Sequence, residues 1–279
     1  MLENPLRFMR DRFVWGLAGA SVLFITTLAG AGEIDPSQKS WHERYRKQAN
    51  APQPADMKLN TDPEPAWDGE GFIDLFNGQD LTGWTALGGT CTFEAIDGEI
   101  VGTTVPGSPS TYLCTDDASW SDFIFTCDTF WEVDGNTGVM FRARSRPRKN
   151  AETPDEVSTA PEDQEVYGPQ VEMEGFDGWT KGRNWSGAVY GQSCGGYWYP
   201  LWLKEHAAAR AALKPGVWNR MTVRAKGNVV QTWINGVPAA YWEDEGSYPS
   251  GFFGLQVHSG GRGTIRWRNL RVKSLDTEP

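Results

Sequence analysis

The sequence lacks several short motifs that mark common catalytic and cofactor sites. It contains no H-E-x-x-H metal motif, no P-loop and no G-x-G-x-x-G turn after a strand. It has only 3 histidines, and none of its 4 cysteines is part of a C-x-x-C pair. These absences argue against a zinc protease, a nucleotide-binding domain, a zinc knuckle and a thioredoxin-type redox site.

Positive charge is also scarce, and no long basic run is present. Lys and Arg total 26 against 36 Asp and Glu, which gives a net charge of −10 and a pI near 4.9. This balance makes nucleic acid an improbable partner, because nucleic-acid binding needs a concentrated basic surface. The acidity itself is explained by solubility and identifies no substrate.

The N-terminus predicts export. Arg7, Arg10 and Arg12 precede an uncharged stretch that ends in the small residues Ala29, Gly30 and Ala31. A basic start, an apolar run and a small-residue site are typical of a secretory signal cleaved after Ala31. The run is also long enough for an uncleaved membrane anchor, so residues 1–32 are a signal peptide or an anchor. We expect the rest of the chain to be periplasmic or on the cell surface.

Four cysteines fit an oxidising compartment: Cys91, Cys114, Cys127 and Cys194. They allow two disulfides in three pairings, among which the sequence does not choose. We expect at least one bond to form. The alternative is a set of free thiols buried in the core.

Residues 33–66 are polar and rich in proline, and we interpret them as a linker that carries no chemistry. From there the chain changes to short alternating strands. In one of them, Phe123, Phe125 and Cys127 share a face and alternate with Ile124, Thr126 and Asp128. This period predicts one all-β domain over residues 67–279, with two antiparallel sheets packed face to face.

Four further features are local. Asn235-Gly236 predicts a tight hairpin, because both residues tolerate positive φ. A bulge near Arg268–Asn269 would restore the register of the last strand. Residues 145–165 are charged and nearly free of apolar residues, which predicts a mobile loop. Residues 201–216 are Ala-rich and form the one good helix candidate.

Polar residues at strand spacing mark a candidate site. Gln170, Glu172 and Glu174 alternate with Val171 and Met173 in the segment YGPQVEME. Gln256 and His258 alternate in the same way in GLQVHSG, and Arg142 stands out of phase with Phe141. If these strands are neighbours, one sheet face carries carboxylates, a histidine, an arginine and amides. An ordinary solvated sheet face is the alternative.

Aromatic residues are the second signal, because 14 Trp and 8 Tyr are unusually many. Several lie in Gly-rich, turn-like sequence: Trp179, Trp185, Tyr190, Tyr197, Trp198 and Tyr199. Aromatic faces stack on the apolar face of a sugar ring, and nearby amides address its hydroxyls. These rings therefore indicate a carbohydrate ligand, or else hydrophobic loops folded back on the domain.

The order of several segments resembles one known family. GFIDLFNGQDLTGWT, FEAIDGEIVG, GVMFRAR, GPQVEME, SGAVYGQ and GFFGLQVHSGGRGTIRWRNLRVKSL are similar to the 3-keto-disaccharide hydrolase domain, over about Gly71 to Leu275. The resemblance implies a concanavalin-like β-sandwich (jelly roll) whose concave sheet holds the active site. It also implies an exported enzyme that cleaves glycosides already oxidised to a ketone at C3. Relatives often carry Glu where this sequence has Gln192.

The resemblance assigns roles to the polar residues. Glu172 and His258 are expected to hold one divalent metal ion or to act as an acid–base pair, with Glu174 as the alternative base. Arg142 is expected to stabilise the enolate. Four further residues are expected to bind substrate: Gln170, Gln256, Tyr190 and Gln192.

Two readings compete with the enzyme. A non-catalytic lectin-like module would use the same concave sheet for carbohydrate, with stacking and amides but no base. A purely structural protein would be attached to a membrane through the N-terminal segment.

Overall fold

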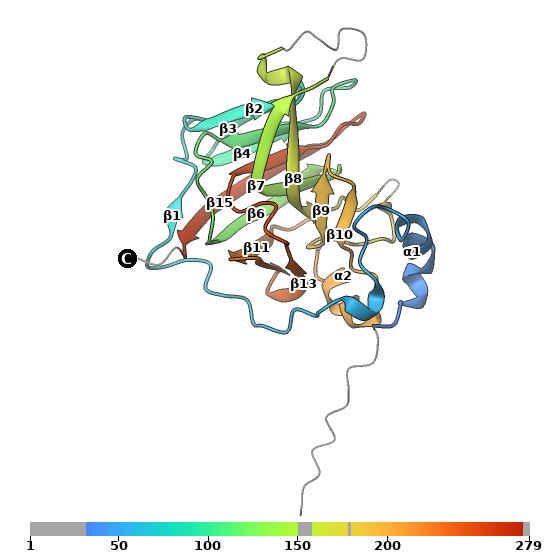
Figure 1. Ribbon diagram of the computed structural model, residues 1–279. Helices are drawn as coiled ribbons and strands as arrows, with labels where there is room; N and C mark the ends of the chain where they lie inside the picture. Colours follow the sequence, from blue (N-terminus) through green and yellow to red (C-terminus); the bar gives the residue numbers. More distant parts are fainter. Residues whose placement is uncertain (1–31, 150–157, 178–179, 276–279) are drawn as a thin grey trace, which may run out of the picture. The chain divides into compact units, whose positions relative to one another are not determined.

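Two antiparallel sheets form the body of the computed structural model, which describes residues 32–149, 158–177 and 180–275 (Figure 1). One sheet has the strand order β13-β12-β11-β6-β15-β4-β3, with β1 beside β15, and the other has the order β10-β9-β8-β7-β14-β5-β2. The strands are β1 (Ile73–Asp74), β2 (Trp84–Leu87), β3 (Thr92–Ile96), β4 (Glu99–Thr103), β5 (Thr111–Thr115), β6 (Phe123–Val133), β7 (Thr137–Pro147), β8 (Gln164–Met173), β9 (Val189–Gln192), β10 (Gly196–Tyr199), β11 (Asn219–Lys226), β12 (Val229–Ile234), β13 (Val237–Glu243), β14 (Phe252–Val257) and β15 (Thr264–Ser274).

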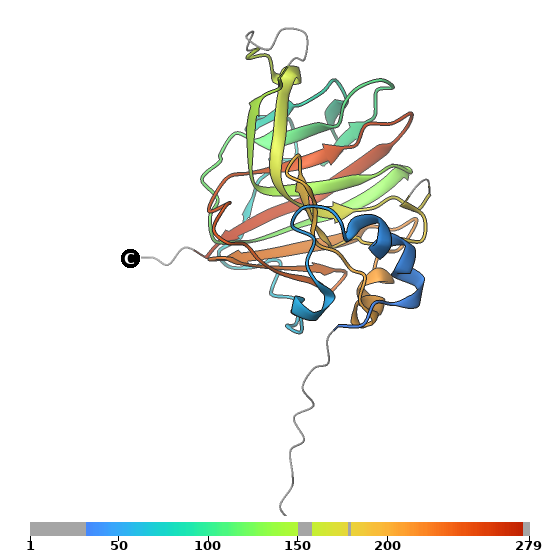
Figure 2. The same cartoon turned by 45° about the vertical axis from the view of Figure 1, so that its right-hand side comes forward.

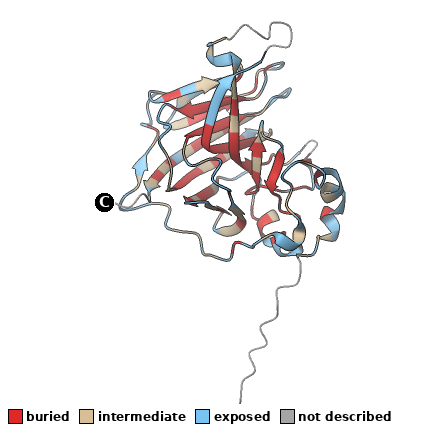
Figure 3. Ribbon diagram, in the orientation of Figure 1, coloured by how far each residue is buried: buried red, intermediate tan, exposed pale blue. Residues whose placement is uncertain are grey.

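The core lies between the two sheets, as the buried ribbon segments in Figure 3 show. Phe125 of β6 has no exposed surface and stacks on Phe253 of β14, with ring centroids 4.5 Å apart. Val171 and Met173 of β8 are equally buried in this core. The prediction of an all-β, two-sheet antiparallel sandwich of the jelly-roll type is therefore confirmed.

Two local predictions are also confirmed. Asn235 and Gly236 have φ angles of 51° and 82° and join β12 to β13, as a tight hairpin turn requires. The register of β15 against β6 shifts between Arg268 and Arg271, and Asn269 lies there with a φ of 52°. This bulge returns Leu270 and Val272 to the core.

The predicted helix and loop are shorter than expected. Within residues 201–216, the helical part is a 3₁₀ turn (Lys204–His206) followed by α2 (Ala207–Arg210). Leu201, Trp202 and Leu203 are instead buried against neighbouring segments, so tertiary packing overrides the helix propensity. The predicted loop shrinks because β7 and β8 extend into it and a 3₁₀ turn (Pro161–Asp163) precedes β8; residues 150–157 lie outside the described residues.

The segment interpreted as a linker packs on the domain along its described length. It contains a 3₁₀ turn (Pro36–Gln38), α1 (Lys39–Tyr45) and a second 3₁₀ turn (Pro54–Asp56). Figure 2 shows this segment, in blue, beside the strands at one end of the sandwich. It is tied down by specific contacts, such as the hydrogen bond of 2.9 Å from Trp185 Nε1 to Gln38 Oε1. We call residues 33–66 the N-terminal arm.

The prediction of at least one disulfide is wrong, because all four cysteines are free. Cys114 lies on β5 and Cys127 on β6, in different sheets and in different hydrophobic clusters. Both are buried, and burial raises the pKa of the Cys127 thiol to about 12. They pack as small apolar side chains, which was the alternative interpretation.

The predicted signal or anchor, residues 1–32, lies almost wholly outside the described residues. In the part of the chain that the structure describes, we find no helix with the length and apolar character needed to cross a membrane.

Candidate functional site

A cavity of about 200 Å³ opens on the outer face of the sheet that contains β7, β8, β9 and β14. Six predicted site residues line it together: Gln170, Glu172, Tyr190, Gln192, Gln256 and His258. Six further residues complete the wall: Tyr45, Gln48, Ser110, Asn136, Arg183 and Tyr197. The shared alternation phase of β8 and β14 therefore does bring these predicted residues to one place.

Strand alternation explains why Gln170 and Glu172 face the cavity. Val171 and Met173, between and after them, have no exposed surface and fill the core on the other side of β8. On the neighbouring strand, Gly138 pairs with Glu172. A Cβ atom at Gly138 would lie 2.2 Å from Gln170 Nε2, so only glycine leaves room for this amide.

Glu172 is held through one of its two oxygens. Asn136 Nδ2 donates a hydrogen bond of 2.9 Å to Oε1, and Arg183 Nη2 lies 3.4 Å from the same atom. Oε2 accepts no hydrogen bond from the part of the chain that the structure describes. The carboxylate is thus fixed in orientation and keeps one oxygen for a ligand.

Glu174 has a different environment and does not line the cavity. It is 2% exposed and its Oε1 accepts a hydrogen bond from Arg183 Nε. Burial raises the pKa of Glu174 to about 7; the Glu172 carboxylate adds to this effect and Arg183 opposes it. The position of Glu174 does not support its predicted role as the alternative base.

Arg142 does not join the site either. Its side chain is buried and donates hydrogen bonds of 2.7 Å to the Ser121 carbonyl oxygen and 2.9 Å to that of Gly227. It also pairs with Asp122 at 3.0 Å. The expectation that Arg142 faces the same pocket is wrong because β7 shifts its register between Met140 and Arg144, which breaks the alternation that the prediction assumed.

Arg183 is the cation that the sequence did not reveal. It has no exposed surface, and its guanidinium reaches both Glu172 and Glu174. It follows a Gly-Trp-rich stretch with no strand pattern, so alternation gave no signal for it. Its charge compensates the two carboxylates in a desolvated setting where an unpaired charge would be costly.

His258 follows the last residue of β14 at the cavity wall. Its Nδ1 lies 2.7 Å from the Ser259 carbonyl oxygen. Because a carbonyl oxygen only accepts, this contact is a hydrogen bond when Nδ1 carries the proton. In the neutral ring, Nε2 then has a free lone pair, and in the charged ring it carries a transferable proton.

Three buried amide atoms of the cavity residues have no hydrogen-bond partner among the described residues: Gln170 Nε2, Gln256 Oε1 and Asn136 Oδ1. The Gln256 amide is oriented by a hydrogen bond of 2.9 Å from Nε2 to the Tyr112 hydroxyl. A buried polar group without a partner costs free energy. A ligand that both donates and accepts hydrogen bonds, as a sugar hydroxyl does, would satisfy all three.

The N-terminal arm, which we interpreted as a linker, completes the cavity wall with Tyr45 and Gln48. Arg183 Nη1 donates a hydrogen bond of 2.9 Å to the Tyr45 hydroxyl. Gln48 Oε1 accepts one of 3.3 Å from the Tyr197 backbone N–H. The sequence could not reveal these contacts, because the arm is far from Arg183 and Tyr197 along the chain.

The residues present do not by themselves complete a metal site. Glu172 and His258, the predicted ligands, both line the cavity. No group of three or more His, Cys, Asp or Glu suited to a metal occurs in the described ranges, and Arg183 already neutralises Glu172. The metal at Glu172 and His258 stays a prediction, and no step below depends on it.

Residues 191–195, GQSCG, match the letters of the G-x-S-x-G motif found in serine hydrolases. That motif works on a turn between a strand and a helix, where a histidine reaches the serine. Here the turn joins β9 to β10, and the described hydrogen-bond partner of the Ser193 hydroxyl is Gln192 Nε2, at 3.3 Å. The match is therefore a hairpin turn rather than a nucleophile site.

The aromatic residues singled out in the sequence separate by position. Tyr190 and Tyr197 line the cavity, and Trp185 is buried beneath it against Arg183. Trp198 and Tyr199 line a second cavity. Trp179 lies outside the described residues.

Several solved structures are similar to this chain at low sequence identity. A proposed glycosyl hydrolase from Parabacteroides distasonis is 21% identical, covers 77% of this chain and 100% of its own, and has a TM-score of 0.47. The carbohydrate-binding module CBM66 from Bacillus subtilis is 16% identical, with 72% and 100% covered and a TM-score of 0.43. A Bacillus subtilis protein of unknown function with a galectin-like fold is 16% identical, with 70% and 90% covered and a TM-score of 0.47.

Among curated proteins, no sequence matches the chain. The family model of the 3-keto-alpha-glucoside-1,2-lyase-like domain matches residues 71–273, more than two thirds of the sequence. The predicted resemblance is confirmed, and the chain belongs to the family of 3-keto-alpha-glucoside-1,2-lyase-like domains.

Proposed function

We propose that the protein cleaves glycosides whose sugar carries a ketone at C3, by removal of the C2 proton and elimination of the C1 substituent. The family supports a glycoside-related hydrolase or carbohydrate-binding function. The observation that favours catalysis is that Glu172 and His258 line one cavity together with buried amides that have no hydrogen-bond partner among the described residues. A lectin needs the amides and the aromatic rings but no base and no acid.

The chemistry follows from the position of the ketone. A C3 carbonyl acidifies the C2–H bond, and the glycosidic oxygen at C1 lies β to the carbanion. Loss of the C2 proton to a base places the electron pair in the enolate, whose collapse forms the C1–C2 double bond and breaks the C1–O bond. The leaving oxygen takes a proton from an acid. Water then adds across the double bond, with its oxygen at C1 and a proton at C2, so the net reaction is hydrolysis.

We assign the base to Glu172 and the acid to His258. Among the described residues no donor binds Oε2 of Glu172, while Asn136 and Arg183 fix Oε1. His258 in its charged form presents the Nε2 proton to the leaving oxygen. Gln170, Gln256 and Tyr190 would orient the sugar hydroxyls from the cavity wall.

Arg183 takes over the electrostatic role that we predicted for Arg142. Its guanidinium is part of the cavity wall, so its positive charge lowers the energy of negative charge that develops on the C3 oxygen. It also positions Glu172 through the contact at 3.4 Å. Because the site is buried, this charge is weakly screened and its effect is larger than it would be in water.

The decisive experiment incubates the purified protein with methyl 3-keto-α-glucopyranoside and with the unoxidised glycoside. We expect methanol release from the keto-glycoside alone, with a transient enone absorbance if elimination outruns hydration. Glu172→Gln and His258→Ala are each expected to lower kcat by about 10²–10⁴. Gln79→Ala, at an exposed glutamine that does not line the cavity, is the matched control and should keep turnover unchanged.

Two outcomes would overturn the assignment. If both variants keep turnover near that of the unmodified protein, Glu172 and His258 are not the acid and base. If the protein binds the glycoside but turns over no keto-sugar, the lectin-like function replaces the enzyme. Turnover that a chelator abolishes and one divalent ion restores would support the predicted metal at Glu172 and His258.

The proposal includes export, which the basic and apolar N-terminus favours. Expression of the full chain with a tag at its C-terminus, followed by cell fractionation, tests it. We expect the tag in the periplasmic or surface fraction. Mass measurement of the N-terminus then distinguishes a cleaved signal from a retained anchor.

A further inference from the structure

A second and larger cavity, of about 560 Å³, lies on the other side of the edge strand β10. Trp198 lines this cavity, whereas Tyr197, the residue before it, lines the candidate active site. The register of β10 against β9 is irregular between Tyr197 and Tyr199, and Tyr199 lines this cavity beside Trp198. The two cavities have no lining residue in common. The second cavity is therefore a distinct place on the molecule.

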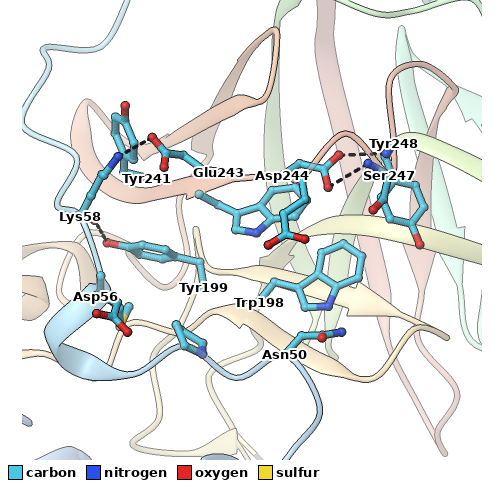
Figure 4. A pocket seen from close by; sticks show the side chains of 14 residues that line it. Asn50, Asp56, Lys58, Trp198, Tyr199, Tyr241, Glu243, Asp244, Ser247 and Tyr248 are labelled. Carbon is cyan, nitrogen blue, oxygen red and sulfur yellow. Dashed lines mark hydrogen bonds and ion pairs between the residues drawn. The ribbon is translucent and has the colours of Figure 1, made fainter.

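The rings of Trp198, Trp242 and Tyr248 lie together in this wall, and Figure 4 labels Trp198 and Tyr248. Trp198 and Trp242 stack with centroids 5.1 Å apart and planes 23° apart. Trp198 and Tyr248 lie 5.5 Å apart with planes 34° apart. Trp198 is 8% exposed, while Trp242 and Tyr248 are half-buried and keep surface toward the cavity.

Carboxylates and one amide surround the rings. Glu243 is neutralised by Lys58 at 2.7 Å, and Asp244 accepts backbone hydrogen bonds from Ser247 and Tyr248. Asp56 and Glu245 also line the cavity, and neither carboxylate forms an ion pair within the described ranges. The excess negative charge excludes phosphates, sulfates and acidic sugars as ligands.

We propose that this second cavity is a binding site for a neutral, unoxidised oligosaccharide. The half-buried rings of Trp242 and Tyr248 present apolar surface to the C–H face of a pyranose. The free carboxylates and Asn50 accept its hydroxyl hydrogens. The site takes no part in the chemistry assigned to Glu172 and His258. It therefore does not rest on the proposed function, and it would hold a glycan against the protein.

The ring geometry decides between a sugar and an organic cation. A cage for a quaternary or protonated amine needs rings that stand as walls around one point, so that their faces converge on the charge. The rings here pack on one another with planes 23° and 34° apart, so their faces do not converge on one point as those of a cage do. The carboxylates alone attract a cation, so amines belong in the test.

The test titrates the full-length protein with maltotriose, an α-linked glucose oligomer, and follows the indole N–H signals by NMR. We expect the signals of Trp198 and Trp242 to shift with a Kd in the millimolar range or below. Trp242→Ala should lower the affinity at least about tenfold. Glu245→Gln and Asn50→Gly change exposed residues and leave the rings intact, and each should lower the affinity about threefold or more; glycine suits the φ of 64° at position 50.

Two control variants make the result specific. Trp218→Ala removes a half-buried tryptophan that contacts Phe130 and Arg268, outside both cavities, and should leave the affinity unchanged. Gln170→Ala alters the candidate active site and should leave the Trp198 and Trp242 shifts in place. Choline and spermidine, as cationic probes, should produce no shift at concentrations where maltotriose does.

Three outcomes would overturn the inference. If maltotriose shifts neither indole signal, the cavity is not a site for this sugar class. If the shifts disappear in Gln170→Ala but persist in Trp242→Ala and Glu245→Gln, the sugar binds in the other cavity. If choline or spermidine binds where maltotriose does not, the cavity is a cation site. None of these results depends on turnover of a keto-glycoside.

Discussion

Arg183 donates a hydrogen bond of 2.9 Å from Nη1 to the Tyr45 hydroxyl, which ties the N-terminal arm to the candidate active site. The same guanidinium contacts Glu172 and Glu174. Tyr45 precedes the part of the chain that the family model matches, residues 71–273. A residue outside the matched domain thus helps to position the predicted base.

Tyr45→Phe tests this relationship. The change removes one acceptor from a buried guanidinium, so Arg183 loses part of its fixed geometry and holds Glu172 less well. We expect kcat on the keto-glycoside to fall about tenfold, equivalent to about 1.4 kcal/mol, with a smaller change in KM. Tyr167→Phe, at a half-buried tyrosine under Arg146, is the matched control. Equal effects of both variants would remove Tyr45 from the mechanism.

Gly138→Ala tests whether the Gln170 amide needs the space beside Gly138. The new Cβ would lie 2.2 Å from Gln170 Nε2, so the amide must leave its place at the cavity wall. We expect weaker binding of substrate, by about tenfold, with little change in the unfolding midpoint if the side chain rotates freely. Gly261→Ala is the control, because a Cβ there meets nothing within 4 Å. Unchanged binding in Gly138→Ala would show that Gln170 does not contact the ligand.

Arg142→Met tests the corrected role of the arginine that we first placed in the site. Its hydrogen bonds to the Ser121 and Gly227 carbonyls and its pair with Asp122 are structural. We expect the free energy of unfolding to fall by about 2–3 kcal/mol, while kcat of the folded protein stays within about twofold. Arg144→Met, at an exposed neighbour, should change stability by less than about 0.5 kcal/mol. A selective loss of kcat in Arg142→Met would restore the original assignment.

The free cysteines give a prediction with a simple readout. Mass spectrometry of non-reduced peptides should find four free thiols, because the buried Cys91, Cys114 and Cys127 are not bonded in the core. The unfolding midpoint should be the same with and without a reductant. Detection of one disulfide-linked peptide pair in the folded protein would contradict this. Cys194, which is half-buried, should react first with a thiol reagent.

The fold could be predicted because its signals are local and repeated. Alternation in Phe123, Phe125 and Cys127 reports a half-buried strand without any knowledge of the partner strands. The signal for the turn at Asn235-Gly236 was equally local, because few residue types tolerate the positive φ angles that the turn requires. The helix at residues 201–216 was overestimated because Leu201–Leu203 are buried by contacts that propensity does not include.

The candidate site could be predicted only where the alternation along a strand determines which sheet face a side chain points to. Gln170, Glu172, Gln256 and His258 meet because they keep the phase of β8 and β14. The prediction for Arg142 failed because an irregularity in β7 changes the alternation of its side chains. Arg183 and Tyr45 come from irregular or distant segments, and no period links them to the sheet. Only the folded chain brings them into contact with Glu172.

Glu174 gives the last prediction, a dependence of stability on pH. Burial raises its pKa from 4.5 to about 7, so the fold favours the protonated carboxyl. The stability that this group contributes is therefore complete below pH 4.5 and decreases as the pH rises through about 7. Glu174→Gln imitates the neutral form and therefore lacks this pH dependence. The dependence amounts to a change of up to about 3 kcal/mol in the free energy of unfolding between pH 4.5 and about 7.

The measurement is the urea midpoint of both proteins between pH 4.5 and 8. We expect the stability of Glu174→Gln relative to the unmodified protein to increase with pH over this range, because only the unmodified protein must ionise a buried carboxyl. Other titrating groups, such as the buried His206, are common to both proteins and cancel in the difference. Glu94→Gln, at an exposed position of β3, should show no such trend. A difference that decreases with pH would show that Arg183 keeps Glu174 ionised throughout, because the pair would then stabilise the fold most at neutral pH.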